Sequence, residues 1–109
     1  MTFDELREWS IQHNVEKRTK EGFLDVITNI GKDSPNRIDE YFEDKFNPEY
    51  LEINIYKVAF TISNWPECDF NYIASYAKIE YKGKNMGVYK LIFNHEGEVE
   101  DDYWSSNED

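Results

Sequence analysis

The sequence has one cysteine, Cys68, and neither a repeat nor a low-complexity tract. One cysteine excludes an intrachain disulfide framework. No stretch of eighteen apolar residues occurs, and the N-terminus "MTFDELREWS" lacks a basic region followed by an apolar run. We therefore expect no signal peptide and no membrane-spanning helix, and a cytoplasmic location.

Signals for catalysis and for cofactors are also scarce. The only histidines, His13 and His95, lack the short spacing of zinc ligands, and no phosphate-binding or dinucleotide-binding glycine pattern occurs. The segment "NHEGEVEDD" does not have the acidic spacing of an EF-hand. The sequence thus predicts no catalytic residue, no cofactor and no metal site.

Basic residues are few relative to acidic ones. The chain has 12 Lys and Arg against 23 Asp and Glu, a net charge of −11, and seven of its last fourteen residues are acidic. Such a chain is repelled by phosphate backbones and by anionic lipid, so we expect neither nucleic acid nor a membrane as direct partner. A basic protein or a cationic ligand is the natural complement. The alternative is that the charge serves solubility alone, and the oligomeric state is not predicted.

Aromatic residues are abundant, with seven Phe, eight Tyr and three Trp. Their burial can offset the entropy lost on folding, which argues against disorder. The length of 109 residues fits one core. We expect a single domain over 1–109, with 105–109 frayed because "SSNED" has no apolar residue.

The first half of the sequence has helical periodicity. Thr2 and Glu5 are spaced as a capping box, a second helix is expected over 19–30 with Gly31 as its left-handed C-cap, and a third runs from the N-cap Ser34 until Pro48 stops it. The apolar residues at helical spacing are Phe3, Leu6, Trp9, Phe23, Val26, Ile27, Ile30, Ile38, Tyr41 and Phe42.

From Tyr50 onward the apolar period changes to two. The alternation in 50–62 shifts phase at Ile55 and Tyr56, which predicts a β-bulge, and further strands are expected near 70–81, 87–94 and 98–104. Trp65, in the loop between the first two strands, is expected either to cap the core, which is favoured, or to act as a contact anchor. Helices followed by short-linked strands indicate an α+β fold with an antiparallel meander. A curved cystatin-like or NTF2-like sheet is one compatible architecture.

Two acidic segments are candidate contact surfaces. In the last strand we expect Val99 and Tyr103 to face the core. Tyr103 and Trp104 are of residue types that often anchor interfaces, and acidic charge around such anchors speeds capture of a basic partner. The candidate partner-binding residues are Asp39, Glu40, Glu43 and Asp44 in the third helix, and Glu98, Glu100, Asp101, Asp102, Tyr103 and Trp104 in the last strand.

Length, the order of helices before a meander, and the acidic aromatic end "YKLIFNHEGEVEDDYW" make the chain resemble the small acidic immunity proteins encoded beside bacterial secreted toxins. The resemblance implies a cytoplasmic inhibitor that binds a cognate toxin, often a basic nuclease, and blocks its active site or another essential surface. It carries no residue-by-residue assignment of contacts.

Two other functions fit the same pattern. One is a small-molecule binder or enzyme of the NTF2-like kind, with Asp101 or a pocket tyrosine as its polar group. If Val99 and Tyr103 face inward, alternation would place Asp101 inward as well, although an exposed edge position for Asp101 is favoured. The other is a DNA mimic that binds a nucleic-acid-binding protein through carboxylates spaced like phosphates.

Overall fold

The computed structural model describes residues 1–43 and 45–105. Its elements in chain order are α1 (Phe3–Gln12), α2 (Val15–Asp33), α3 (Pro35–Phe42), the 3-10 helix η1 (Pro48–Tyr50), β1 (Leu51–Ser63), β2 (Phe70–Tyr81), β3 (Lys84–Phe93) and β4 (Val99–Ser105). The strands form one antiparallel sheet in the order β1-β2-β3-β4. The expected α+β fold, with N-terminal helices followed by a meander, is confirmed.

Helix α1 begins at the predicted capping box. The Glu5 amide donates to Thr2 Oγ1 and the Thr2 amide donates to Glu5 Oε1, both at 3.1 Å. The hydrogen bond from the Thr2 backbone, and to a smaller extent the one with the Thr2 side chain, lowers the pKa of the Glu5 carboxyl. Of the expected apolar stripe, Trp9 is buried, whereas Phe3 is 82% exposed.

Helix α2 is longer than predicted at both ends. It begins after Asn14, which takes the left-handed conformation at φ 52°, and it continues through Gly31 to Asp33. The expectation that Gly31 ends the helix is therefore wrong, because a glycine lowers helix propensity without preventing the helix from continuing. Phe23 and Ile27 are buried as expected.

Helix α3 starts at Ser34 and Pro35 as predicted, but it ends at Phe42 rather than at Pro48. Glu43 takes the left-handed conformation, at φ 55°, and its amide donates to the last turn of the helix. Pro48 instead occupies the first turn of η1, where its missing N–H costs nothing.

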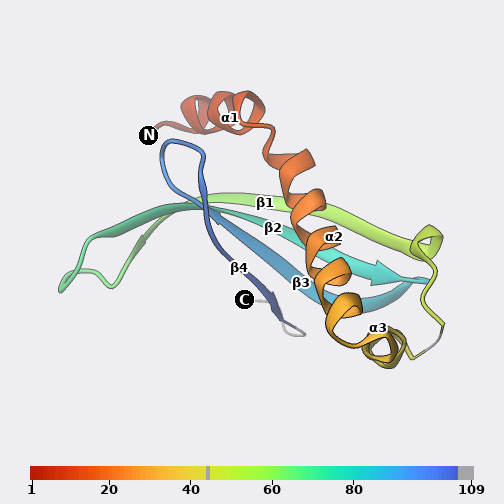
Figure 1. Cartoon of the computed structure of the whole chain (residues 1–109). Coiled ribbons are helices and arrows are strands. Elements are labelled where there is room, and N and C mark those ends of the chain that lie inside the picture. The colour runs from red at the N-terminus through yellow and green to blue at the C-terminus, as the bar shows by residue number, and fades with distance from the viewer. Residues whose placement is uncertain (44, 106–109) are drawn as a thin grey trace.

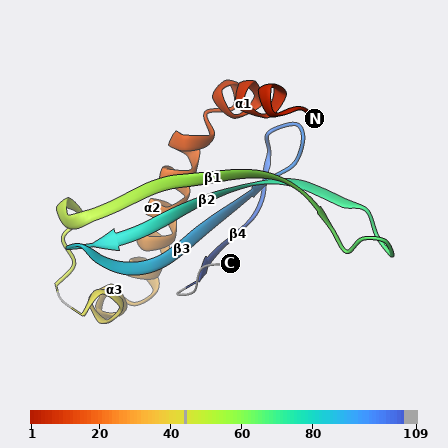
Figure 2. The same ribbon diagram turned by 180° about the vertical axis from the view of Figure 1, so that it is seen from behind.

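The three helices lie on one side of the sheet, and α2 crosses that face (Figure 1). Seen from behind, the other face of the sheet is open (Figure 2). The register of β1 against β2 shifts between Ile55 and Lys57, so the predicted bulge is confirmed. The main core cluster consists of Trp9, Val15, Phe23, Ile27, Ile38, Phe42, Ile73, Ala77, Ile79, Tyr81, Tyr89, Leu91 and Phe93.

A buried polar pair joins α2 to the middle of the sheet. Thr19 Oγ1 donates to the Val15 carbonyl at 2.6 Å, which leaves its oxygen to accept from Ser75 Oγ at 2.9 Å. Neither side chain is exposed to solvent. Hydroxyls buried without partners would destabilise the fold, so this pairing fixes where α2 lies on β2.

Strand β4 differs from the prediction in the direction of the side chains that follow its bulge. A register shift between Ile92 and Phe93 changes its alternation, so that Trp104 pairs with Tyr89 on the helix side while Tyr103 pairs with Lys90 on the open side. Tyr103 is 52% exposed and Val99 is 49% exposed. The expectation that Tyr103 faces the core is wrong, because a bulge overrides simple alternation. Val99 does lie on the helix side, opposite the core residue Phe93, but its edge position leaves it half exposed.

The favoured position of Trp65, capping the core, is wrong: it is 68% exposed, in the loop joining β1 to β2. The expected fraying of 105–109 concerns mainly 106–109, which lie outside the described residues; Ser105 is the last residue of β4.

Candidate acidic site

The acidic cluster predicted in α3 is partly engaged in local structure. Asp39 Oδ1 accepts the Phe46 amide at 2.9 Å and so ties the segment after α3 to the helix. Glu43 Oε2 pairs with Lys84 Nζ at 2.9 Å. Glu40 is exposed. Asp44 lies outside the described residues.

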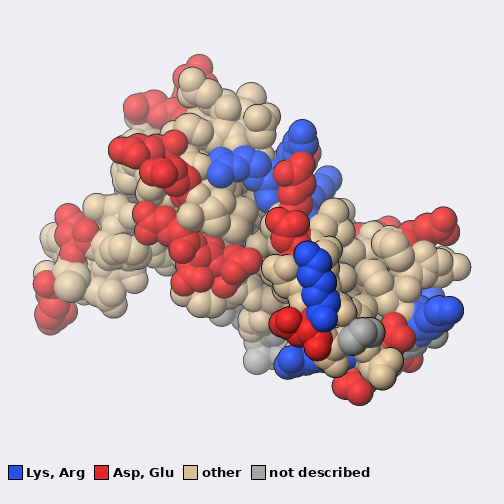
Figure 3. Space-filling view, viewed as in Figure 1, with Lys and Arg blue, Asp and Glu red and all other residues tan. Residues whose placement is uncertain are grey.

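The second predicted cluster lies on the β3–β4 turn and on β4, an edge strand of the sheet. Glu98, Glu100 and Asp101 are exposed there together with Glu96, and Figure 3 shows acidic atoms gathered over this part of the molecule. The side-chain oxygen of Asn94 accepts the amides of Glu96 and Glu98, each at 3.0 Å. The carboxylates are therefore carried by an internally bonded turn.

The acidic turn is also attached to the helices. Trp9 Nε1 donates to the His95 carbonyl at 2.9 Å, and Arg18 Nη1 donates to the Gly97 carbonyl at 2.7 Å. Gly97 has φ +86°, and a Cβ there would overlap the ring of His13. Only glycine therefore suits this position. These contacts hold the acidic turn in one place relative to α1 and α2.

Asp102 lies on the helix side of β4, where sequence analysis did not place it. Tyr89, which has no exposed surface, donates its hydroxyl to Asp102 Oδ2 at 2.7 Å. Burial and this carboxylate raise the pKa of the Tyr89 hydroxyl far above its usual value, so it stays a donor at neutral pH. Gly22 makes room for the hydroxyl, since a Cβ there would lie 2.7 Å from it.

A groove of about 340 Å³ runs between α2 and β4. Its carboxylates come from Asp102 on β4 and from Glu21 and Asp25 on α2. The remaining lining residues are Arg18, Gly22, Val26, Asn29, Tyr89, Leu91 and Val99. The groove combines an apolar floor with mainly acidic walls, a lining that suits the alkyl stem and charged end of a lysine or an arginine.

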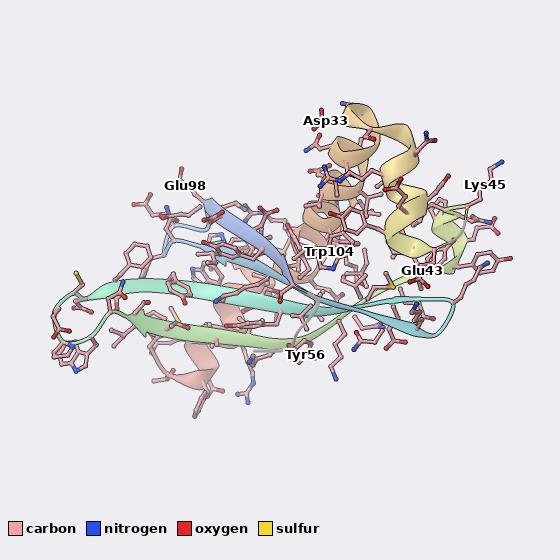
Figure 4. The ribbon with its side chains drawn as sticks, turned by 90° about the horizontal axis from the view of Figure 1, so that it is seen from below. Asp33, Glu43, Lys45, Tyr56, Glu98 and Trp104 are labelled. Carbon is pink, nitrogen blue, oxygen red and sulfur yellow. The ribbon has the colours of Figure 1, made fainter. Side chains whose placement is uncertain are left out.

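Trp104 connects the two acidic segments instead of projecting from them. Figure 4 shows it between Glu98 and Glu43. Its ring lies 5.0 Å from that of Phe23 and 5.4 Å from that of Tyr41, and its Nε1 donates to the Met86 carbonyl at 2.8 Å. It is a half-buried part of the core that joins β4 to the helices.

Asp101 and Tyr103 belong to the open face of the sheet. The Tyr103 hydroxyl donates to Asp101 Oδ2 at 2.7 Å, and this bond, with the Asp102 amide, lowers the pKa of the Asp101 carboxyl. Asp101 is exposed. General acid–base catalysis favours a carboxylate whose pKa is raised toward neutrality in a dry cleft, so Asp101 has neither the surroundings nor the pKa shift for that role.

Glu21 and Asp25 were not among the predicted contact residues. They are four residues apart, which places them on one side of α2, and they flank Gly22. This spacing of two acids beside a glycine was the feature of the sequence that could have indicated an acidic site on α2. The spacing does not reveal that β4 brings Asp102 to the same groove.

A basic and aromatic row on the open face was missed as well. The register aligns Lys57, Tyr76, Lys90 and Tyr103 across the four strands. Lys57 Nζ lies 4.1 Å from the centroid of the Tyr76 ring, within cation–π range. Burial lowers the pKa of Lys90, but the hydroxyl groups of Tyr76 and Tyr72 raise it by more, so the net shift is upward. The centre of the open face therefore carries basic and aromatic side chains in place of acidic ones.

Within 1–43 and 45–105, no group of three or more His, Cys, Asp and Glu side chains is placed to hold a metal ion. None of the helices in that part of the chain combines the length and the apolar character needed to cross a membrane. Comparison with protein-family models, with curated proteins and with solved structures found no match.

Proposed function

We propose that this protein is an acidic, protein-binding inhibitor of the immunity type, which neutralises a basic partner such as a nuclease toxin by covering its active or essential surface. The observation that carries the proposal is the α2–β4 groove, where Glu21, Asp25 and Asp102 converge beside the acidic β3–β4 turn. Asp39, Glu40 and Glu43 would add charge at the far end of the surface.

Recognition would centre on a lysine or arginine of the partner. Its alkyl stem would contact Leu91 and Val99 while its charged end meets the carboxylates of Asp25 and Asp102. Charge-assisted hydrogen bonds of this kind are among the strongest polar contacts in proteins. The exposed acids Glu98 and Glu100 would attract the partner over a longer range and speed its association.

The rigidity of the acidic turn favours tight binding. Trp9 and Arg18 hold the turn through its carbonyl groups, and Tyr89 fixes the Asp102 carboxylate. Because these groups are ordered before the partner arrives, little conformational entropy is lost on binding.

The test begins with an arginine-rich peptide titrated into the labelled protein and followed by NMR. Shifts should gather at Asp25, Val99 and Asp102, and fall off steeply as salt is added. Replacing Glu21 by Gln and Asp25 by Asn together should weaken the peptide affinity by about tenfold. The matched control replaces Glu67 by Gln and Asp69 by Asn, in the β1–β2 loop, and should change the affinity little.

A complex with a basic protein encoded beside the gene would then be isolated, and its association rate measured at several salt concentrations. The groove variant and a variant with Gln at Glu98 and Glu100 should both associate more slowly than the wild type. Equal rates for wild type and both variants, or an absence of any salt effect, would count against the proposal.

A further inference from the structure

The two edges of the sheet differ sharply in charge. Strand β4 carries three acids, Glu100, Asp101 and Asp102, in seven residues. Strand β1 has thirteen residues but only two charges, Glu52 and Lys57. Charge on an edge strand prevents pairing with other chains, whereas a long, uncharged edge invites it. Among the described residues β1 is hydrogen-bonded in the sheet to β2 alone, and Figure 2 shows it along the free margin.

We infer that β1 pairs with β1 of a second copy of this chain, antiparallel and around a two-fold axis, to form a continuous eight-stranded sheet. In such an isologous contact the same surface of both copies is used. If one residue of the first copy contacts a given residue of the second, the same two residues also meet with the copies exchanged. The helices of both copies would then lie on the same side of the joined sheet.

The bulge in β1 and its two charges select one register. Leu51, Ile53 and Ile55 face the helix side before the bulge, and Val58 faces it afterwards, because each pairs with a helix-side residue of β2. Directly opposed residues in an antiparallel pair share a face. With Tyr56 as the extra residue, Asn54 then lies on the two-fold axis and Ile53 opposes Ile55 of the second copy.

In this register Glu52 lies opposite Lys57 of the second copy, and symmetry repeats the pair. Both residues are exposed and on the open face of the sheet. Opposite charges directly across a strand pair are stabilising and like charges are destabilising. The only charges of β1 are thus complementary in the register that its apolar residues also favour.

The apolar groove beside β1 supports the same arrangement. It has a volume of about 430 Å³, and its lining includes Leu6 and Val58 together with Phe3 and Ile11, which are 82% and 78% exposed. The incoming strand would bring its Leu51 beside Val58. Contiguous exposed apolar surface of this kind commonly marks a contact with another chain.

Sedimentation of the 109-residue chain over a range of concentrations tests the inference. We expect a species of twice the 13.1 kDa chain mass. Glu52→Lys and Lys57→Glu should each raise the dimer dissociation constant by about tenfold or more, because each creates two like-charge pairs. The double exchange of both charges should restore the dimer.

The matched control is Lys78→Glu, which makes the same charge change on the same face but on the inner strand β2, and it should leave the dimer intact. A monomer at every concentration would overturn the inference. Dimers unaffected by either single exchange, or a double exchange that fails to restore a dimer lost in the singles, would overturn it as well.

A cross-link tests the register directly. Asn54→Cys in a Cys68→Ser background should form a disulfide-linked dimer on mild oxidation, because the two Asn54 positions meet at the axis. Thr61→Cys in the same background lies beyond the paired segment and should remain monomeric on a non-reducing gel. Equal cross-linking of both variants would reject the register.

Discussion

At the scale of single residues, the clearest dependence joins Gly22, Tyr89 and Asp102. The Tyr89 hydroxyl lies 2.7 Å from the position that a Cβ at Gly22 would take, and 2.7 Å from Asp102 Oδ2. The absence of a side chain in α2 thus permits a buried hydroxyl, and the hydroxyl orients a carboxylate in the groove. The free energy of unfolding that is lost when Gly22 is given a side chain should therefore depend on the Tyr89 hydroxyl.

A double-mutant cycle measures that dependence. Tyr89→Phe should lower the free energy of unfolding by about 1.5–3 kcal/mol, the usual range for a hydrogen bond to a charged group. Gly22→Ala should lower it by about 1–3 kcal/mol through overpacking. When Gly22→Ala is combined with Tyr89→Phe, the alanine should be neutral or stabilising, because the clashing oxygen is gone and alanine favours the helix. Urea unfolding gives all four values; an equal cost in both backgrounds would contradict the geometry.

The Asp101–Tyr103 pair makes a prediction about pH. The bond from the Tyr103 hydroxyl lowers the pKa of Asp101 below its ordinary value of 3.8. A group whose pKa is lower in the folded state stabilises the fold fully above its unfolded pKa, and this contribution is lost as the pH falls through the folded pKa. NMR titration of the carboxyl carbon should show a midpoint below 3.8, and Tyr103→Phe should raise it. An unchanged midpoint in that variant would show that the bond has no effect on the carboxyl.

At the scale of elements, the aromatic side chain of Trp104 joins β4 to the helices. Trp104 packs against Phe23 of α2 and against Tyr41 and Phe42 of α3. It therefore links the last strand to two helices. Removing it should loosen both the acidic edge and α3.

Trp65, in the exposed β1–β2 loop, offers a matched comparison. Trp104→Ala should lower the free energy of unfolding by about 3 kcal/mol or more, as buried aromatic truncations do. Trp65→Ala should change it by less than about 0.5 kcal/mol, because Trp65 is 68% exposed. Thermal and denaturant unfolding of both variants provide the measurement. Similar losses for the two would mean that Trp104 is not a packing residue.

At the scale of the whole molecule, the sheet separates the two proposed contacts. Strand β1 and strand β4 lie at opposite edges of the sheet. The acidic groove and turn gather at the β4 edge, whereas the inferred pairing uses the β1 edge. The proposed partner binding and the inferred self-association would therefore use different surfaces.

This separation predicts independent effects. Replacing Glu98 and Glu100 by Gln should weaken the binding of the arginine-rich peptide without changing the sedimentation of the dimer. Lys57→Glu should weaken the dimer without changing the binding of the peptide. Mutations at distant sites without shared contacts usually act additively, so the triple variant should combine both losses. A change in dimer dissociation caused by the β4 variant would show that the two edges communicate.

Much of the fold follows from local sequence. The capping box at Thr2 and Glu5, the start of α3 at Ser34 and Pro35, and the phase change at Ile55 and Tyr56 each depend on neighbouring residues, and each was predicted correctly. Gly31 and Trp65 were predicted wrongly. Helix continuation and exposure depend on packing that neighbouring residues do not specify.

Periodicity, capping and composition were enough to determine the α+β class, the order of the elements and the excess of acidic residues near the C-terminus. Which acids meet was decided by the folded arrangement. The shift at Ile92 and Phe93 turns Asp102 toward α2, and the docking of α2 brings Glu21 and Asp25 to the same groove. Neither event is visible in local sequence, because a bulge of one residue reverses side-chain direction and helix docking depends on contacts between residues distant in the chain.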